Sequence, residues 1–374
     1  MTTVGVLRET AAGERRVALT PDAARSLSER DVRVLVETGA GSTAFFDDDG
    51  YASATVVTRE RVYANSDILV CLRVPEDAAA SCRTGQVLIG LFDTLDDPGS
   101  VRRLAAAGVT VLSLDLLPRT LSRAQSMDAL TSQANVAGYK AALLAADAYP
   151  GFFPMLTTAA GTTRPARVLV LGAGVAGLQA IATARRLGAR VTGYDVREQA
   201  RADIASTGAS VLDLAGGMNS ADGYARALAS DEAERQLAAL TEAAPEFDVV
   251  ITTAKVPGGR SPLLVSEEAL HAMRPGSVVI DLGGNVAGSS PDTRTVVNGV
   301  TTIGAPELAA GTPVAASTAY ARNLLALLGL LMPARDVILD LDDEILRAVV
   351  VGHGGHIIHP RVLAALAEQE AARS

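Results

Sequence analysis

A glycine-rich turn at residues 172–177 constrains the fold more than any other feature of the sequence. The apolar run Val168-Leu169-Val170-Leu171 predicts a buried strand, and the Ala-rich stretch from Leu178 to Leu187 predicts a helix. Glycines at the first, third and sixth positions of the turn permit a tight bend, close approach of a pyrophosphate to the backbone, and tight packing of helix on strand. Because a helix N-terminus favours an anion, this order of elements predicts a dinucleotide-binding unit.

A carboxylate at the end of the next predicted strand indicates which dinucleotide binds. The strand at residues 190–194 is followed by Asp195, which lies 18 residues after Gly177. A carboxylate at this place accepts hydrogen bonds from the adenosine ribose hydroxyls and repels the 2′-phosphate of NADP. We therefore predict NAD(H) as the cofactor, although Arg197 is of a type that accommodates a 2′-phosphate. The alternative is a glycine-rich turn in an α/β domain that binds no nucleotide.

Short apolar runs alternate with helical segments throughout the chain. This alternation predicts an α/β fold with two Rossmann-like parallel-sheet domains, joined by long helices with a cleft between them. The long helices are expected at Met127–Tyr149 and Ser317–Met332. The N-terminal α/β domain would comprise residues 1–133 plus 318–374, and the NAD(H)-binding domain residues 134–317. The expected strands lie at residues 4–7, 32–36, 67–72, 87–91, 109–114, 168–171, 190–194, 210–212, 249–252, 278–281 and 301–303.

Composition and charge narrow the classes of function. A chain of 374 residues is too long for one ordinary core. Its net charge of -9 repels phosphate backbones, so we expect no nucleic-acid partner. Cys71 and Cys82 make no disulfide framework and favour a reduced, intracellular protein, with Cys71 a small core residue. The apolar stretch at residues 323–333 is too short to span a bilayer, so we expect a soluble chain without direct membrane insertion.

The polar start of the first long helix is the most specific pattern in the chain. It reads Ser122-Arg123-Ala124-Gln125-Ser126-Met127-Asp128-Ala129-Leu130-Thr131. This segment resembles the signature of the NAD(H)-binding alpha subunit of proton-translocating NAD(P) transhydrogenase, in the alanine dehydrogenase/transhydrogenase superfamily. Residues 154–162, 13–18 and 323–325 fit the same family. The resemblance therefore covers essentially the whole chain.

The resemblance implies a reaction and partners. Members of the family hold NAD(H) with its nicotinamide at the cleft between their two domains. Hydride passes directly between this nicotinamide and that of NADP(H) on a partner subunit, and a membrane component couples the transfer to proton translocation. Such transfer needs two rings held close together with water excluded, rather than an acid or base. The family also implies a homodimer, through a hairpin at residues 155–163, and a cytoplasmic location peripheral to the inner membrane.

The resemblance also assigns residues to the site. Gln125, Asp128 and Thr131 would line the nicotinamide pocket, with either Arg119 or Arg123 beside the carboxamide. One extra residue between Pro118 and Arg123, relative to the family pattern, leaves that choice open. Two departures from the family pattern are Lys255, where an aliphatic residue is usual, and a threonine in place of the usual serine at Thr131. The expected cofactor-binding residues are Gly172, Ala173, Gly174, Val175, Gly177, Asp195, Val196, Arg197, Gly223, Tyr224, Gln236 and Lys255, with Tyr224 on a loop that closes over the nucleotide.

Two other functions use the same fold. Alanine dehydrogenases share the turn, but by their family pattern they need a Lys and a His in the N-terminal domain. Residues 1–139 contain neither, and the matching positions are Arg73 and Phe92. Loss of the general acid/base would remove that chemistry. A non-catalytic NAD sensor is the second alternative, against which the Gln125 to Asp128 stretch argues, because a sensor needs no elaborated nicotinamide pocket.

Two further segments have competing interpretations. His353, His356 and His359 suggest a metal site, but their spacing along a turn and a strand does not converge ligands. We therefore predict a glycine-rich turn between two short strands and no metal. The segment Gly13-Glu14-Arg15-Arg16 is either a functional turn or a solvated one, and the sequence does not distinguish the two.

Overall fold

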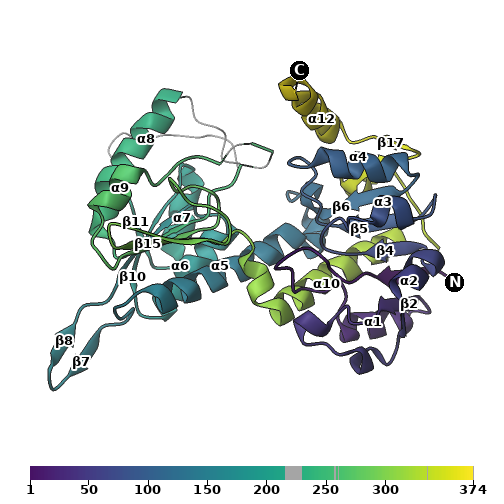
Figure 1. The fold of residues 1–374 in the computed structure, drawn as a ribbon, viewed down its shortest axis with the longest axis horizontal. Coiled ribbons are helices and arrows are strands. Elements are labelled where there is room, and N and C mark those ends of the chain that lie inside the picture. The colour runs from purple at the N-terminus through teal and green to yellow at the C-terminus, as the bar shows by residue number, and fades with distance from the viewer. Residues whose placement is uncertain (215–229, 257, 260, 335, 374) are drawn as a thin grey trace. The chain divides into compact units, whose positions relative to one another are not determined.

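The computed structural model describes residues 1–214, 230–256, 258–259, 261–334 and 336–373. The chain divides into two compact units: unit 1 is Met1–Gln133 with Ala310–Ser374, and unit 2 is Ala134–Ala309. The sequence-based division put the corresponding boundaries after residues 133 and 317. Each unit has a predominantly parallel sheet with helices packed against it, so the α/β class is confirmed (Figure 1).

Unit 1 is built on an eight-stranded sheet of order β17-β16-β6-β5-β4-β1-β2-β3. Successive residues of its inner strands alternate between two apolar clusters: Ile68 and Val70 face one, and Leu69 and Cys71 face the other. Both faces are therefore covered, which explains the continuous apolar runs in the sequence. The strands are β1 (Thr3–Val6), β2 (Arg33–Glu37), β3 (Thr55–Val57), β4 (Ile68–Val70), β5 (Val87–Gly90), β6 (Thr110–Ser113), β16 (Val350–His353) and β17 (His356–Ile357).

The helices of unit 1 begin where the sequence provides caps. The Thr20 side chain accepts from the Ala23 N–H at the start of α1, and the Asp97 side chain accepts from the Ser100 N–H at the start of α4. The C-terminal segment enters the same sheet, because β16 pairs antiparallel with β6. The α-helices are α1 (Pro21–Ser28), α2 (Arg59–Asn65), α3 (Ala78–Ser81), α4 (Pro98–Ala106), α10 (Pro313–Leu331), α11 (Glu344–Val349) and α12 (Pro360–Arg373), and the 3-10 helices are η1 (Ser42–Ala44), η2 (Asp48–Tyr51), η3 (Leu114–Leu116) and η4 (Ser122–Met127).

Among the described helices, α10 alone is long and apolar enough to cross a membrane by length and composition, and half of it is buried. The sequence argument counted only residues 323–333 and is wrong on length, because the helix begins at Pro313. Its buried face belongs to the core of unit 1, where Leu324 and Leu328 are fully buried. The Tyr320 hydroxyl donates to the Cys71 carbonyl at 2.8 Å. This helix therefore packs as a core helix of unit 1.

Unit 2 is built on a seven-stranded sheet of order β11-β10-β9-β12-β13-β15-β14, in which only the edge pair β14–β15 is antiparallel. The central strand β9 lies between β10 and β12. Its strands are β9 (Arg167–Leu171), β10 (Arg190–Tyr194), β11 (Ser210–Val211), β12 (Val249–Thr252), β13 (Val278–Asp281), β14 (Arg294–Val297) and β15 (Val300–Gly304). Its helices are α6 (Val175–Arg186), α7 (Glu198–Ser206), α8 (Ser230–Ala243), α9 (Glu267–Ala272) and η5 (Ala244–Glu246). Two helices cross the boundary between the units in sequence, α5 (Ala129–Ala148) and η6 (Leu308–Gly311).

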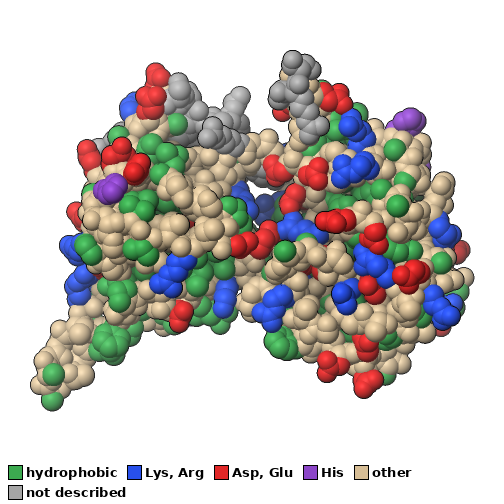
Figure 2. Space-filling view, in the orientation of Figure 1, with side chains coloured by type: hydrophobic (Ala, Val, Ile, Leu, Met, Phe, Trp, Pro, Cys, Tyr) green, Lys and Arg blue, Asp and Glu red, His purple; other side chains and the backbone are tan. Residues whose placement is uncertain are grey.

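A separate hairpin, β7 (Leu156–Thr158) with β8 (Gly161–Thr163), extends away from the sheet of unit 2 (Figure 1). All six strand residues are exposed. Met155 at its base is 62% exposed. The space-filling view shows only apolar and neutral side chains on the hairpin tip (Figure 2). The hairpin that the resemblance implied at residues 155–163 is therefore present, with Leu156–Thr158 and Gly161–Thr163 as its two arms.

The strands that the sequence did not predict lie at sheet edges. β3 and β14 are edge strands, and α2 follows β3 directly. Three of the four residues of β14 are exposed and the fourth is half-buried, so this strand has no apolar run to identify it. The strands β10, β12 and β13, by contrast, have the predicted bounds: every residue of β12 and β13 is buried, and so are three of the five residues of β10.

Candidate functional site

The glycine-rich turn joins β9 to α6, and each glycine has its own steric reason. Gly172 has a φ of 97°, which favours glycine, and its N–H donates to the Tyr194 carbonyl at 2.8 Å. A Cβ at Gly177 would lie 1.8 Å from the Gly172 carbonyl oxygen, so this position admits only glycine. A Cβ at Gly174 would meet nothing within 4 Å. The turn is therefore closed at its first and last glycines and open at the middle one.

The open side of the turn is the N-terminus of α6. Gly174 is its N-cap, and no side chain in the described part of the chain caps it. The first N–H groups of a helix have no intrahelical partner, and they carry the positive end of the helix dipole. An open approach to uncapped N–H groups suits a pyrophosphate. The residues present thus fit the phosphate part of a dinucleotide, with Val175 as the first helical residue.

Asp195 follows β10 and is held beside this turn. Its Oδ2 accepts the Ala173 N–H at 2.7 Å, and its Oδ1 accepts the Arg197 N–H at 2.9 Å. The Arg197 guanidinium adds two bonds of 2.9 Å, from Nε to Oδ1 and from Nη2 to Oδ2. Burial raises the pKa of Asp195, but the bonds from Arg197 and Ala173 outweigh it and the pKa is lowered. Asp195 is therefore an anion in the folded chain near neutral pH.

Residues that were not predicted to be part of the site hold the turn in place through hydrogen bonds and close packing. The Asn285 side chain donates to the Ala254 carbonyl at 2.9 Å, and the neighbouring Thr253 hydroxyl donates to the Gly172 carbonyl at 3.0 Å. Asp281 ends β13 and accepts the Asn285 N–H at 2.9 Å. On the opposite side a Cβ at Gly138 of α5 would lie 2.0 Å from the Ala176 carbonyl oxygen. The run Gly283-Gly284-Asn285, which follows the predicted strand at residues 278–281, is the sequence signal that could have pointed to this support.

The other predicted cofactor-binding residues of unit 2 differ in how exposed they are. Gln236 of α8 is buried and hydrogen-bonds the Tyr194 side chain, next to Asp195. Val196 is half-buried, whereas Lys255 is exposed in the segment after β12. Gly223 and Tyr224 lie outside the described residues.

In unit 1, three of the predicted nicotinamide-pocket residues form one network. Asp128 directly precedes α5, and its Oδ1 accepts the Thr131 N–H at 2.8 Å, as an N-cap does. Its Oδ2 accepts from the Thr131 hydroxyl at 2.6 Å and from Arg119 Nε at 3.0 Å. Arg119 Nη2 also donates to the Thr131 hydroxyl at 2.6 Å. Arg123 instead pairs with Asp343 at 2.6 Å, and Gln125 is exposed on η4.

A buried ion pair lies in the segment for which the sequence left two interpretations open. The side chains of Glu14 and Arg16 are each only 4% exposed and pair at 2.5 Å. Arg16 Nη1 donates to the Gln133 side chain at 2.9 Å. The solvated turn is therefore wrong for these two residues, although Gly13 and Arg15 are exposed.

Glu9, near this pair, carries the most perturbed carboxylate of the unit. Burial raises the pKa of Glu9 to about 7, although the Leu72 and Arg73 N–H groups hydrogen-bond the carboxylate. The Leu72 bond is 2.6 Å long. No sequence pattern indicated this site, because its donors come from the end of β4, more than sixty residues away.

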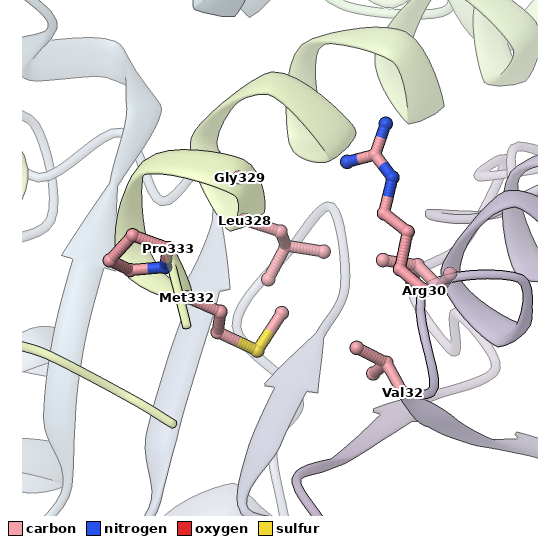
Figure 3. A pocket seen from close by; sticks show the side chains of 7 residues that line it. Arg30, Val32, Leu328, Gly329, Met332 and Pro333 are labelled. Atoms are coloured by element: carbon pink, nitrogen blue, oxygen red, sulfur yellow. The ribbon is translucent and has the colours of Figure 1, made fainter. Parts of the chain in front are cut away.

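Two remaining features contain none of the predicted site residues. His353 and His356 pair across the β16–β17 hairpin, which confirms the predicted turn between short strands. No group of three potential metal ligands occurs in the part of the chain that is described. A cavity of about 340 Å³ lies in unit 1, with Leu328 of α10 and Val32, which precedes β2, on its walls and Arg30 at its side (Figure 3). It is lined by Leu27, Arg30, Val32, Leu328, Gly329, Met332 and Pro333.

Comparison with known proteins finds one family model for each part of the chain. The family models "Alanine dehydrogenase/PNT, N-terminal domain" and "Alanine dehydrogenase/PNT, C-terminal domain" match residues 5–137 and 141–360. The NAD(P) transhydrogenase subunit alpha of Cereibacter sphaeroides is 41% identical and covers 96% of this chain and 71% of its own. A solved transhydrogenase from Sinorhizobium meliloti matches with a TM-score of 0.84 at 37% identity, over 96% of this chain and 99% of its own. The alanine dehydrogenase of Bacillus subtilis is 29% identical over 75% of this chain and 70% of its own.

Two parallel-sheet units, one of them with a glycine turn and a strand-end carboxylate, define the class as a two-domain α/β protein of the dinucleotide-binding type. The chain belongs to the alanine dehydrogenase/PNT family, and within it to the NAD(P) transhydrogenase alpha subunits. Alanine dehydrogenase is a more distant relative. The resemblance found in the sequence is confirmed.

Proposed function

We propose that this chain binds NAD(H) and exchanges hydride with NADP(H) held by a partner subunit. The observation that carries the proposal is the uncapped, open N-terminus of α6 beside an ionised Asp195. The helix end suits the pyrophosphate, and the carboxylate suits an unphosphorylated adenosine ribose. Gly172, Gly174 and Gly177 form the phosphate turn, and the buried Gln236 lies at the side chain of Tyr194, whose carbonyl accepts the Gly172 N–H.

The network of Asp128, Thr131 and Arg119 would bind the nicotinamide half of NAD(H). Bound NAD(H) supplies or accepts the hydride, so the chain has to orient the ring and exclude water. The Thr131 hydroxyl accepts from Arg119 and donates to Asp128, which fixes all three side chains. These bonds support Arg119 rather than Arg123 as the arginine of this pocket, since Arg123 is engaged with Asp343. Gln125, exposed on the adjoining η4, is free to contact the ring or its ribose.

Partners and location follow from the family. The relatives are named as alpha subunits, so we propose association with NADP(H)-binding and membrane subunits that couple hydride transfer to proton translocation. The chain would lie in the cytoplasm, peripheral to the inner membrane through those subunits. A homodimer through the β7–β8 hairpin fits its exposed backbone edges and the exposed Met155.

An amino-acid dehydrogenase is disfavoured by two side chains of unit 1. Arg73 stands where that chemistry would need a lysine, and it pairs with Asp93. Phe92 stands at the histidine position and is buried in the core. Neither can serve as a general acid or base near neutral pH.

A single-turnover hydride-transfer assay tests the proposal. The chain is mixed with a purified NADP(H)-binding subunit, NADH and an oxidised NADP analogue whose reduced form absorbs at its own wavelength. We expect oxidation of NADH only when the partner is present, and no NAD⁺-dependent oxidation of L-alanine. Turnover of alanine would support the dehydrogenase instead. NADH binding without transfer would support the sensor.

A further inference from the structure

The Asp195 carboxylate has no acceptor site left for a ligand. A carboxylate offers about four lone-pair sites, and four donors occupy them here. Two are backbone N–H groups, of Ala173 and Arg197, and two are the Nε and Nη2 of the Arg197 guanidinium. The Asp195 side chain is 8% exposed, and that of Arg197 is 26% exposed. The guanidinium therefore covers the carboxylate from the accessible side.

A ribose can reach this carboxylate only if the guanidinium moves. The backbone donors are fixed by the turn and by the start of α7, whereas the Arg197 side chain can rotate away. We propose that Arg197 is a latch on the ribose site and determines how strongly the site distinguishes an unphosphorylated ribose from a 2′-phosphorylated one. This inference rests on the proposed binding of NAD(H) and adds a residue that sets its specificity.

The latch acts on the two riboses in opposite directions. For an unphosphorylated ribose, the two hydroxyls must compete with a bidentate ion pair, so the latch weakens binding. For a 2′-phosphorylated ribose, the displaced guanidinium is a planar double donor beside the phosphate, and it offsets repulsion by Asp195. Asp195 alone would discriminate more sharply than the pair does.

Arg197→Ala isolates the latch, because the backbone N–H of residue 197 stays in place. The matched control is Arg201→Ala, which removes the same charge from α7, the helix that Arg197 precedes as N-cap residue, but from a side chain paired with Asp213 at 2.6 Å. The probes are ADP-ribose and 2′-phospho-ADP-ribose, which leave out the nicotinamide half. Their dissociation constants are measured by isothermal titration calorimetry on the full chain.

We expect Arg197→Ala to bind ADP-ribose as tightly as the wild type or tighter, and 2′-phospho-ADP-ribose about tenfold more weakly. The ratio of the two constants should therefore widen about tenfold or more, and Arg201→Ala should leave it unchanged. Structural damage would weaken both ligands together. A ratio that widens less than threefold, or narrows, overturns the latch. Failure of the wild type to bind either NADH or ADP-ribose would instead overturn the proposed function.

Discussion

Asp195 in unit 2 and Asp128 in unit 1 are both buried carboxylates bound to an arginine, but their donors are arranged differently. Asp195 receives its guanidinium from Arg197, two residues away, and this side chain can leave while two backbone bonds remain. Asp128 receives Arg119 from nine residues away, through a network that the Thr131 hydroxyl closes. A removable partner suits a group that exchanges bonds with a ligand. A closed network suits a group that has to keep its orientation.

The first prediction separates packing from binding within the turn of unit 2. Gly177→Ala places a Cβ 1.8 Å from a backbone oxygen, so we expect unit 2 to lose about 3 kcal/mol of unfolding free energy. A Cβ at Gly174 meets no neighbour, so we expect Gly174→Ala to lose about 1 kcal/mol or less of unfolding free energy. The same Cβ would stand where the pyrophosphate approaches the backbone, so we expect at least tenfold weaker NADH binding. Urea unfolding followed by circular dichroism and NADH titration measure the two effects. Equal stability of the two variants would contradict the steric assignment.

The second prediction extends the comparison to Glu9, a carboxylate that accepts hydrogen bonds from the backbone N–H groups of Leu72 and Arg73. Burial raises the pKa of Glu9 to about 7, whereas the bonds to Asp195 lower the pKa of that carboxyl. Because folding raises the pKa of Glu9, its protonated form contributes to the free energy of unfolding. This contribution is fully present below pH 4.5, the pKa of Glu9 in the unfolded chain, and is lost as the pH rises through 7. The free energy of unfolding that is lost over this pH range is on the order of 3 kcal/mol.

Glu9→Gln should remove this pH dependence. The amide cannot ionise and keeps one carbonyl oxygen for the Leu72 N–H. We therefore expect the stability difference between Glu9→Gln and the wild type to shift in favour of the variant between pH 5 and pH 7. Urea denaturation at a series of pH values measures it. A difference that stays constant across this range would show that Glu9 titrates normally.

The third prediction concerns the closed network of unit 1. Asp128→Asn keeps the shape and removes the charge, so we expect single-turnover hydride transfer to slow by tenfold or more, roughly 1.4 kcal/mol. The NADH dissociation constant should stay within a few-fold. Thr131→Val should slow transfer several-fold, and Thr131→Ser, which keeps the hydroxyl, should not. If Asp128→Asn raised the dissociation constant as much as it slowed transfer, Asp128 would be a binding group like Asp195.

The smallest effect separates the two arginines. Arg119→Ala breaks two bonds of the network and should slow transfer by a few-fold. Arg123→Ala loses an exposed ion pair with Asp343, which solvent screens, and should leave transfer unchanged. Stopped-flow transfer rates of the two variants under identical conditions measure this. The reverse order would move the pocket to Arg123.

The sequence predicted what depends on local pattern and missed what depends on distant partners. The unit from β9 through the glycine turn and α6 to β10 was predictable. Strands buried on both faces appear as continuous apolar runs, and the glycines of the turn lie next to them in the sequence. The Arg16 bond to Gln133 joins residues 117 positions apart, so the burial of Glu14 and Arg16 was not predictable. The edge strand β14 was missed, because its exposed residues have no apolar run.

The site residues show the same limit. The sequence supplied both Asp195 and Arg197 but not the rotamer that joins them with two guanidinium bonds. It also left Arg119 and Arg123 as equals, because the difference between them lies in their partners, Asp128 and Asp343. Neither partner could be assigned from spacing alone.

Titration of the full chain with NADH and NADPH, for the wild type and Asp195→Ala, tests the central claim most directly. A hydrogen bond to a charged acceptor contributes roughly 1.5–3 kcal/mol, and Asp195 would make two to the ribose. We expect the wild type to bind NADH at least tenfold more tightly than NADPH. Asp195→Ala should weaken NADH at least tenfold and abolish most of the preference. Equal affinities of the wild type for NADH and NADPH, or an unchanged NADH affinity in Asp195→Ala, would contradict the assignment of this site.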